Sequence, residues 1–169
     1  MTSALVVRVP AAEPVVGGWR RAHTYDAPLG LPAHVTILYP FVPRVELTKA
    51  EPRLAELVAG HEAFDATFAR TARFPDLLYL EPQPAERFLR LTEAVTAAWP
   101  EHPPYEGAHD DVVPHLTVGQ DAAPETLRAV ERQVQPALPV QKRVTEVQVI
   151  VGRPEVGGSW DVIARFPLA

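Results

Sequence analysis

The chain has 169 residues, of which 47% are hydrophobic and 22% are charged, and it contains no cysteine. These values are ordinary for one globular domain, and the lack of cysteine excludes disulfides, thiolate nucleophiles and cysteine metal sites. The net charge of −5 argues against a protein that binds extended RNA or DNA, because binding to the many phosphates of a nucleic acid needs a basic surface. No apolar stretch approaches the roughly 20 residues that span a bilayer, and the apolar run near the start is too short for a signal peptide, so we expect a cytoplasmic protein without membrane contact.

The first half of the chain shows strand-like and helix-like patterns in alternation. Short β-branched runs and period-two alternation indicate strands, and apolar residues at helical spacing indicate helices. The sequence Thr48-Lys49-Ala50-Glu51 has the form of a capping box, which typically begins a helix. The predicted elements are a strand at 5–9, a helix at 14–24, a loop at 27–32, a strand at 34–39, a helix from 48 to 60, and paired strands at 64–74 and 77–80.

The second half repeats this order. Pro84 and Pro124 each open a helix pattern, and the charged pairs at 20–21 and 142–143 are expected on solvated faces. The predicted elements are a helix from 84 to 98, a loop rich in proline, histidine and acidic residues at 100–111, a strand at 115–119, a helix from 124 to 134, and strands at 147–151 and 160–166, the last after a turn at Gly157-Gly158. Each half therefore runs strand, helix, then paired strands. This shared order predicts a single α+β domain over residues 1–169, with two pseudo-equivalent lobes of antiparallel sheet backed by helices and a central groove.

Two short strings match each other, one in each half: His34-Val35-Thr36 and His115-Leu116-Thr117. Of the six histidines, only these two have a threonine two positions on. Residues two apart in a strand point to the same face, so each string places an imidazole beside a hydroxyl. Either string alone is more simply explained as part of an ordinary strand, but the matched pair favours a function. Two imidazoles facing one groove suit the cleavage of a phosphodiester, in which one group takes a proton and the other gives one.

The loop before the second string contains His102, His109, Asp110 and Asp111. The spacing of these side chains is loose for metal ligands, so we predict a solvated loop that can cover the groove and no metal site. His23 and His61 fall near predicted helix ends and receive no chemical role.

The paired strings resemble those of the 2H phosphoesterase superfamily, which includes the 2′-5′ RNA ligase-like proteins and the RNA cyclic phosphodiesterases. The resemblance rests on the segments 32–41 (PAHVTILYPF) and 114–119 (PHLTVG), and the order of strands and helices extends it over most of the chain. It implies a metal-independent phosphoesterase without a cofactor, which opens a 2′,3′-cyclic phosphate or acts on a 2′-5′ linkage. Its partner would be a small nucleotide or an RNA terminus, and we expect a monomer.

The resemblance implies that His34 and His115 form the acid-base pair, and that Thr36 and Thr117 donate hydrogen bonds to phosphate oxygens. We expect His115 to act as the base on water and His34 as the acid toward the leaving ribose oxygen. An ordinary imidazole pKa of about 6.5 allows one ring to be neutral and the other protonated near neutral pH.

The chain departs from many relatives after the second string, where Gln120 and Asp121 stand in place of a basic residue. Arg153 is the candidate to bind phosphate instead, ahead of Arg8 and Arg44. The candidates for stacking on a base are Tyr39, Phe41 and Tyr105, although aromatic residues, with Trp160 among them, more often serve packing.

Three alternatives remain open at this point. One is a purely structural or protein-interaction role, with the matched strings left as a relic. The same groove could bind a phosphorylated nucleotide without turning it over. It could also act on the cyclic phosphate of a small metabolite, such as an ADP-ribose cyclic phosphate, to which the acidic net charge lends weight.

Overall fold

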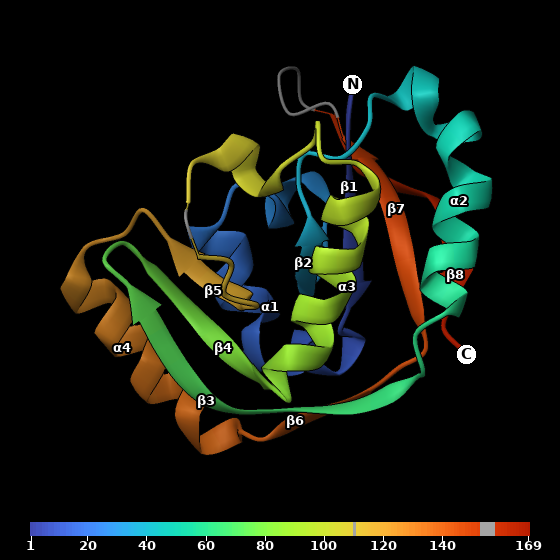
Figure 1. Cartoon of the computed structure of the whole chain (residues 1–169). Helices are drawn as coiled ribbons and strands as arrows, with labels where there is room; N and C mark the ends of the chain where they lie inside the picture. Colours follow the sequence, from blue (N-terminus) through green and yellow to red (C-terminus); the bar gives the residue numbers. More distant parts are fainter. Residues whose placement is uncertain (110, 153–157) are drawn as a thin grey trace.

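Two four-stranded antiparallel sheets, each backed by helices, form the protein in a computed structural model that describes residues 1–109, 111–152 and 158–169 (Figure 1). The strands are β1 (Thr2–Arg8), β2 (His34–Leu38), β3 (Phe64–Phe74), β4 (Leu77–Gln83), β5 (Leu116–Gln120), β6 (Val140–Val144), β7 (Glu146–Gly152) and β8 (Trp160–Pro167). The helices are α1 (Glu13–His23), α2 (Leu47–Ala59), α3 (Ala85–Ala98) and α4 (Pro124–Val134), with short 3-10 turns that include Ala27–Leu29 and Pro104–Gly107. The predicted α+β architecture with two lobes is confirmed.

The lobes are not the two halves of the sequence. The strand orders are β2-β1-β7-β8 and β5-β4-β3-β6, so each sheet contains strands from both halves of the chain. The helices are exchanged in the same way, because α1 packs on β5 and α3 packs on β2. The two lobes are therefore interleaved, and neither half of the chain can form its lobe alone.

The strands that carry the two motifs both lie at sheet edges. β2 ends one sheet and β5 ends the other, and these two edge strands contact each other. In the register of β1 with β2, Val6 lies opposite Thr36 and Arg8 opposite His34, so these side chains share one face of the sheet. The fold therefore brings two edge strands together at the boundary between the lobes.

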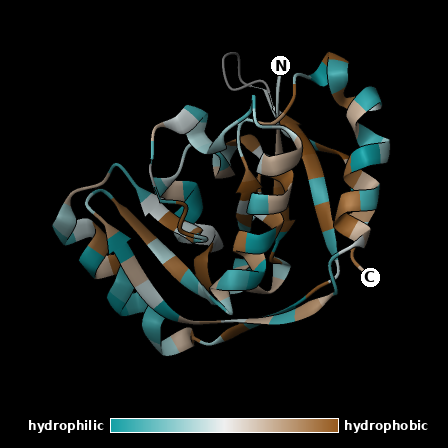
Figure 2. Ribbon diagram, in the orientation of Figure 1, coloured by the Kyte–Doolittle hydropathy of each residue, from teal (hydrophilic) through white to brown (hydrophobic). Residues whose placement is uncertain are grey.

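One continuous apolar core joins the lobes. Phe64, Ala66 and Phe68 alternate along β3 as buried residues, as the period-two pattern predicts. Figure 2 shows hydrophobic residues concentrated on the central strands and on one side of the helices. A second, smaller apolar cluster lies on the face of the first sheet that carries His34 and Thr36. It contains Ala4, Val6, Leu31 and Ile150.

Several local predictions were wrong. α2 begins at Leu47, and its N-cap, Glu46, makes no side-chain capping bond, so the residues from Thr48 lie inside the helix and form no capping box. Strand β6 was missed because polar residues occupy its three central positions, as befits the edge strand of a sheet. Arg20 was expected on a solvated face, but its exposed fraction is 0%. The predicted Gly157-Gly158 turn lies partly outside the described residues.

Candidate active site

The two motif histidines are oriented by the same kind of hydrogen bond, from the ring to a nearby backbone carbonyl oxygen. His34 begins β2 and His115 immediately precedes β5. The Nδ1 atom of His34 lies 2.8 Å from the carbonyl oxygen of Pro32, and that of His115 lies 2.7 Å from the carbonyl oxygen of Val113. Because a carbonyl oxygen only accepts hydrogen bonds, each Nδ1 carries a proton, and Nε2 of the neutral ring keeps a free lone pair. Each ring therefore presents the nitrogen that can take up or release a proton.

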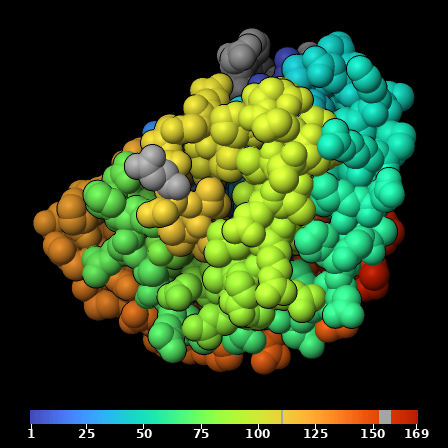
Figure 3. Space-filling view, viewed as in Figure 1, coloured from blue at the N-terminus to red at the C-terminus, as the bar shows by residue number. Residues whose placement is uncertain are grey.

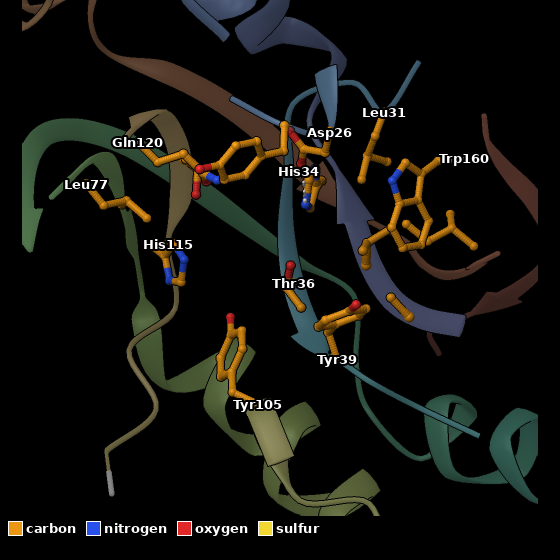
Figure 4. A pocket seen from close by; sticks show the side chains of 15 residues that line it. Asp26, Leu31, His34, Thr36, Tyr39, Leu77, Tyr105, His115, Gln120 and Trp160 are labelled. Atoms are coloured by element: carbon orange, nitrogen blue, oxygen red, sulfur yellow. Dashed lines mark ion pairs between the residues drawn. The ribbon is translucent and has the colours of Figure 1, made fainter. Parts of the chain in front are cut away.

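Both imidazoles and both threonines line one cavity of about 340 Å³ between the lobes (Figure 4). Among the described residues, the hydroxyls of Thr36 and Thr117 have no hydrogen-bond partner, so both can donate to a ligand. The other lining residues are Ala4, Val6, Tyr25, Asp26, Leu31, Tyr39, Leu77, Tyr105, Gln120, Ile150 and Trp160.

A buried arginine and a carboxylate support the His34 side of the cavity. The guanidinium of Arg20 donates to Asp26 at 3.1 Å, and also to the carbonyl oxygens of Thr117 at 2.6 Å and Leu31 at 3.3 Å. The other carboxylate oxygen of Asp26 lies 3.8 Å from Nε2 of His34. No acidic residue among the described ones that line the cavity is paired in this way with His115, so the two histidines differ in their surroundings.

Burial lowers the pKa of both histidines. For His34 the pKa falls to about 4, because removal of the ring from water disfavours the imidazolium. The carboxylate of Asp26 opposes this shift and the guanidinium of Arg20 adds to it. Burial also lowers the pKa of His115, against the opposing effect of its hydrogen bond to Val113. In the ligand-free protein, His34 is therefore neutral at pH 7.

The cavity wall carries little positive charge. Within the described part of the chain, no lysine or arginine lines it, and Arg8 and Arg44 lie elsewhere. Arg153, the leading sequence candidate for binding phosphate, lies outside the described residues. A phosphate in this cavity would therefore meet the two imidazoles, the carboxylate of Asp26, and neutral donors such as the hydroxyls of threonine and tyrosine.

The aromatic candidates divide between the cavity and the core. Tyr39 and Tyr105 line the cavity, and Trp160 packs edge-on against Tyr39 with 6.3 Å between ring centroids. Phe41, in contrast, is 2% exposed and packs against Trp99 in the core, so it has the packing role that aromatic residues more often serve and offers no surface to a base. The strand ends at Leu38, and the chain turns Phe41 inward where apolar burial outweighs exposure to a ligand.

Sequence reasoning missed two residues of this site, Asp26 and Arg20. Arg20 stands four positions after the buried Val16, and this helical spacing was the signal for its place on the inner face of α1. Asp26 lies in a turn that no residue pattern linked to His34.

The described ranges contain neither a group of metal-binding side chains nor a helix that could span a membrane. No three histidine, cysteine, aspartate or glutamate side chains in these ranges are grouped so that they could hold a metal ion. None of the helices in these ranges combines the length and the apolar character needed to cross a membrane.

Comparison with known proteins agrees with this fold. A search of curated protein sequences found no match. Among solved structures, TT0787 of Thermus thermophilus is similar over 99% of this chain and 97% of its own, with 23% identity and a TM-score of 0.66. Escherichia coli LigT complexed with 3′-AMP is similar over 99% of this chain and 98% of its own, with 17% identity and a TM-score of 0.66. A structure described as a phosphoesterase covers 99% of this chain and 98% of its own, with 16% identity and a TM-score of 0.63.

The family assignment rests on a separate comparison. The family model of the 2′-5′ RNA ligase superfamily matches residues 7–154, which include both His-x-Thr motifs, the whole of the β5-β4-β3-β6 sheet, and strands β2 and β7 of the other sheet. The chain therefore belongs to the 2′-5′ RNA ligase superfamily, within the 2H phosphoesterases.

Proposed function

We propose that this protein is a metal-independent phosphoesterase that opens the 2′,3′-cyclic phosphate of a nucleotide or of an RNA end, or acts on a 2′-5′ linkage. The observation that carries the proposal is the arrangement of His34 and His115. Both rings are fixed by a hydrogen bond through Nδ1, which leaves Nε2 available to a ligand, and both rings line the same cavity. The threonine of each motif lines this cavity too, and its hydroxyl has no hydrogen-bond partner among the described residues. Membership of the superfamily supports phosphoesterase chemistry.

The reaction needs one base and one acid. One imidazole takes a proton from water as the water oxygen attacks phosphorus, and the other gives a proton to the ribose oxygen as its bond to phosphorus breaks. The products are a phosphate monoester and a free ribose hydroxyl, and each proton transfer is typically worth about 10²–10⁴-fold in rate. Thr36 and Thr117 donate to the phosphate oxygens, where negative charge grows in the transition state.

The substrate itself completes the required protonation state. His34 is neutral at pH 7 in the ligand-free protein, because burial lowers its pKa to about 4, and burial lowers the pKa of His115 as well. A bound phosphate places a negative charge beside the rings and raises the pKa of the nearer imidazole, which then holds the proton that the leaving oxygen needs.

The charge of the cavity favours a small substrate. The described lining contains no lysine or arginine, and the chain has a net charge of −5. Little positive charge is therefore available to bind the phosphates of a long RNA strand. LigT, which shares this fold, has been solved with 3′-AMP, with NADP+ and with ATP, and these complexes support binding of a nucleotide. The same features also suit a second candidate substrate class, the cyclic phosphate of a small metabolite such as an ADP-ribose cyclic phosphate.

The test is hydrolysis of nucleoside 2′,3′-cyclic monophosphates, and of a short RNA with a 2′,3′-cyclic end, in the presence of EDTA. We expect turnover by the wild type, and a loss of at least about 10²-fold in the His34→Ala and His115→Ala variants. Circular dichroism would verify that both variants fold. Activity that disappears in EDTA and returns with Zn²⁺ or Mn²⁺ would contradict the metal-independent mechanism. Tight nucleotide binding without any product would replace the proposal with a binding module.

A further inference from the structure

A second cavity, with a charged lining, lies beside the catalytic cavity that holds both motif histidines. Its volume is about 250 Å³, and no residue that the structure describes lines both cavities. The lining residues of the second cavity are Arg8, Pro10, Lys142, Glu146, Gln148 and Arg165. One water takes up roughly 30 Å³ in the liquid, so the second cavity has room for a ligand larger than a single water molecule.

The register of the first sheet places the two cavities next to each other on one face. Val6, which lines the catalytic cavity, lies opposite Thr36 on β2 and opposite Gln148 on β7. Gln148 in turn lies opposite Arg165 on β8, so one row of side chains crosses all four strands. The helices α2 and α3 cover the other face, and Figure 3 shows them at the surface there in cyan and yellow-green. The second cavity therefore lies on the face that α2 and α3 leave uncovered.

Positive charge prevails in the second cavity. Arg8, Lys142 and Arg165 supply three cations, and the one carboxylate among the described lining residues belongs to Glu146. Arg165 donates to this carboxylate at 2.8 Å, and the side chain of Gln148 donates to the same oxygen at 2.6 Å. The hydrogen bond from Gln148 lowers the pKa of Glu146, against the effect of burial, so Glu146 is ionised at pH 7. Arg8 and Lys142 form no ion pair with a described residue, and the cavity therefore attracts an anion.

Two buried polar atoms of this lining have no hydrogen-bond partner among the described residues. One is Nε of Arg8, which is a donor, and the other is Oε1 of Gln148, which is an acceptor. Gln148 is 5% exposed, so bulk water does not satisfy its amide oxygen. Its amide nitrogen donates to Glu146, and this bond identifies the oxygen as the atom that is left free. Because buried polar groups are nearly always paired, the two atoms indicate a ligand that both accepts and donates hydrogen bonds.

Hydrogen phosphate meets both requirements. Its ionised oxygens accept hydrogen bonds from Arg8 and Lys142, and its P–OH group donates to the amide oxygen of Gln148. Sulfate, ionised carboxylates and phosphodiesters carry no proton at pH 7, so each of them would leave the amide oxygen of Gln148 unpaired. We propose that the second cavity is a binding site for inorganic phosphate, separate from the catalytic cavity.

Two-dimensional NMR of the ¹⁵N-labelled protein tests this site directly. The Nε–H signal of Arg8 and the side-chain amide signals of Gln148 report on the second cavity, and the ring signals of His34 and His115 report on the catalytic cavity. At pH 7 and constant ionic strength, we expect millimolar phosphate to shift the signals of Arg8 and Gln148 until they saturate. Sulfate should bind there at least about tenfold more weakly, because it leaves a buried acceptor unpaired. No saturable shift, or equal affinity for the two anions, would overturn the proposal.

Three variants test which side chains bind the anion. Gln148→Met keeps most of the buried volume but removes the amide oxygen, so phosphate should lose its advantage over sulfate. Arg8→Met should weaken the binding of both anions at least about tenfold. Arg143→Met is the matched control, because Arg143 is exposed on β6, pairs with Asp65 and does not line the cavity. Phosphate should also raise the urea midpoint of the control more than that of Arg8→Met. Unchanged phosphate affinity in Arg8→Met would overturn the proposal.

Methyl phosphate distinguishes free phosphate from a phosphate ester as the ligand. A phosphate monoester has a second pKa of about 6, so only about a tenth of it keeps the P–OH group at pH 7. We therefore expect methyl phosphate to bind about tenfold more weakly than inorganic phosphate in the same NMR titration. Equal binding of the two would assign the cavity to phosphate esters and overturn the assignment to inorganic phosphate. None of these measurements requires turnover, so failure of this site and failure of the proposed function are distinguishable.

Discussion

Arg20 on α1 donates a hydrogen bond of 2.6 Å to the carbonyl oxygen of Thr117, 97 residues away in the sequence. The same guanidinium holds Asp26, which faces His34, so a single buried side chain connects the supports of both motifs. Its charge is compensated by one carboxylate and two carbonyl oxygens. The position of the second motif relative to the first therefore depends on a residue that belongs to neither.

Replacing Arg20 with methionine should destabilise the fold strongly. The substitution keeps much of the apolar stem but leaves Asp26 and two carbonyl oxygens without their donor. Breaking a buried pair in this way typically costs about 3–5 kcal/mol. Urea unfolding at pH 7 would measure the loss. Arg21→Met is the matched control, because Arg21 is exposed on the same helix, and its change should stay within about 0.5 kcal/mol. Equal effects of the two variants would contradict the connecting role of Arg20.

Much of the fold follows from local sequence patterns. The alternation of Phe64, Ala66 and Phe68 identified β3, and the helical spacing of Phe88, Leu91 and Val95 identified α3. Strands that follow each other across a turn were predicted to pair, as β3 does with β4 and β7 with β8. The pairing of strands far apart in the sequence could not be read in this way, because it depends on contacts between distant parts of the chain. The interleaving of the two halves, with β1 beside β7 and β4 beside β5, is visible only in the folded structure.

We expect the pH dependence of kcat/KM to be bell-shaped, with its maximum below pH 6.5. The mechanism needs one neutral and one protonated imidazole, so the rate is highest between the two pKa values of the free enzyme. Burial lowers both values below 6.5, to about 4 for His34. As pH rises above both, the acid loses its proton and kcat/KM falls. Because a bound phosphate favours the imidazolium, the falling limb of kcat should lie at higher pH than that of kcat/KM.

Initial rates from pH 4 to 9 at low and at saturating substrate would check this expectation. Activity after return to pH 7 would separate titration from unfolding at the acidic end. A kcat/KM that keeps rising between pH 6.5 and 8 would contradict the lowered pKa values of the free enzyme.

Replacing Asp26 with asparagine should lower the pKa of His34 further. The carboxylate raises the pKa of His34 against the effect of burial, and without it the guanidinium of Arg20 lowers this pKa further. The limb of kcat/KM that reports the titration of His34 should then move to lower pH. NMR titration of the His34 ring would measure the pKa directly, with Asp65→Asn as the control. An unchanged pKa in Asp26→Asn would show that the 3.8 Å contact has no electrostatic effect in solution.

The candidate site was predicted only in part, for a physical reason. Residues two apart in a strand point to the same face, so His34, Thr36, His115 and Thr117 could be identified from their spacing. Asp26 lies in the turn between α1 and β2, and no periodic pattern marks a position of this kind. The side on which Phe41 lies could not be read from the strand either, because the strand ends before it and the alternation of faces no longer applies.

Gly152 contacts Trp160, which lines the cavity that holds both motif histidines. The two residues lie opposite each other on β7 and β8, and a Cβ atom at Gly152 would lie 2.5 Å from Cδ2 of the indole. An alanine therefore forces the Trp160 ring, which lines the cavity, out of its place. We expect Gly152→Ala to raise KM several-fold and to destabilise the fold by about 1–3 kcal/mol, as overpacking typically does. Gly18→Ala is the matched control, because a Cβ there would lie no closer than 4.0 Å to Arg21, and an alanine within a helix typically stabilises by about 0.5–1 kcal/mol. Urea unfolding and steady-state kinetics would measure both variants, and the same change in both would show that the Gly152–Trp160 contact does not shape the cavity.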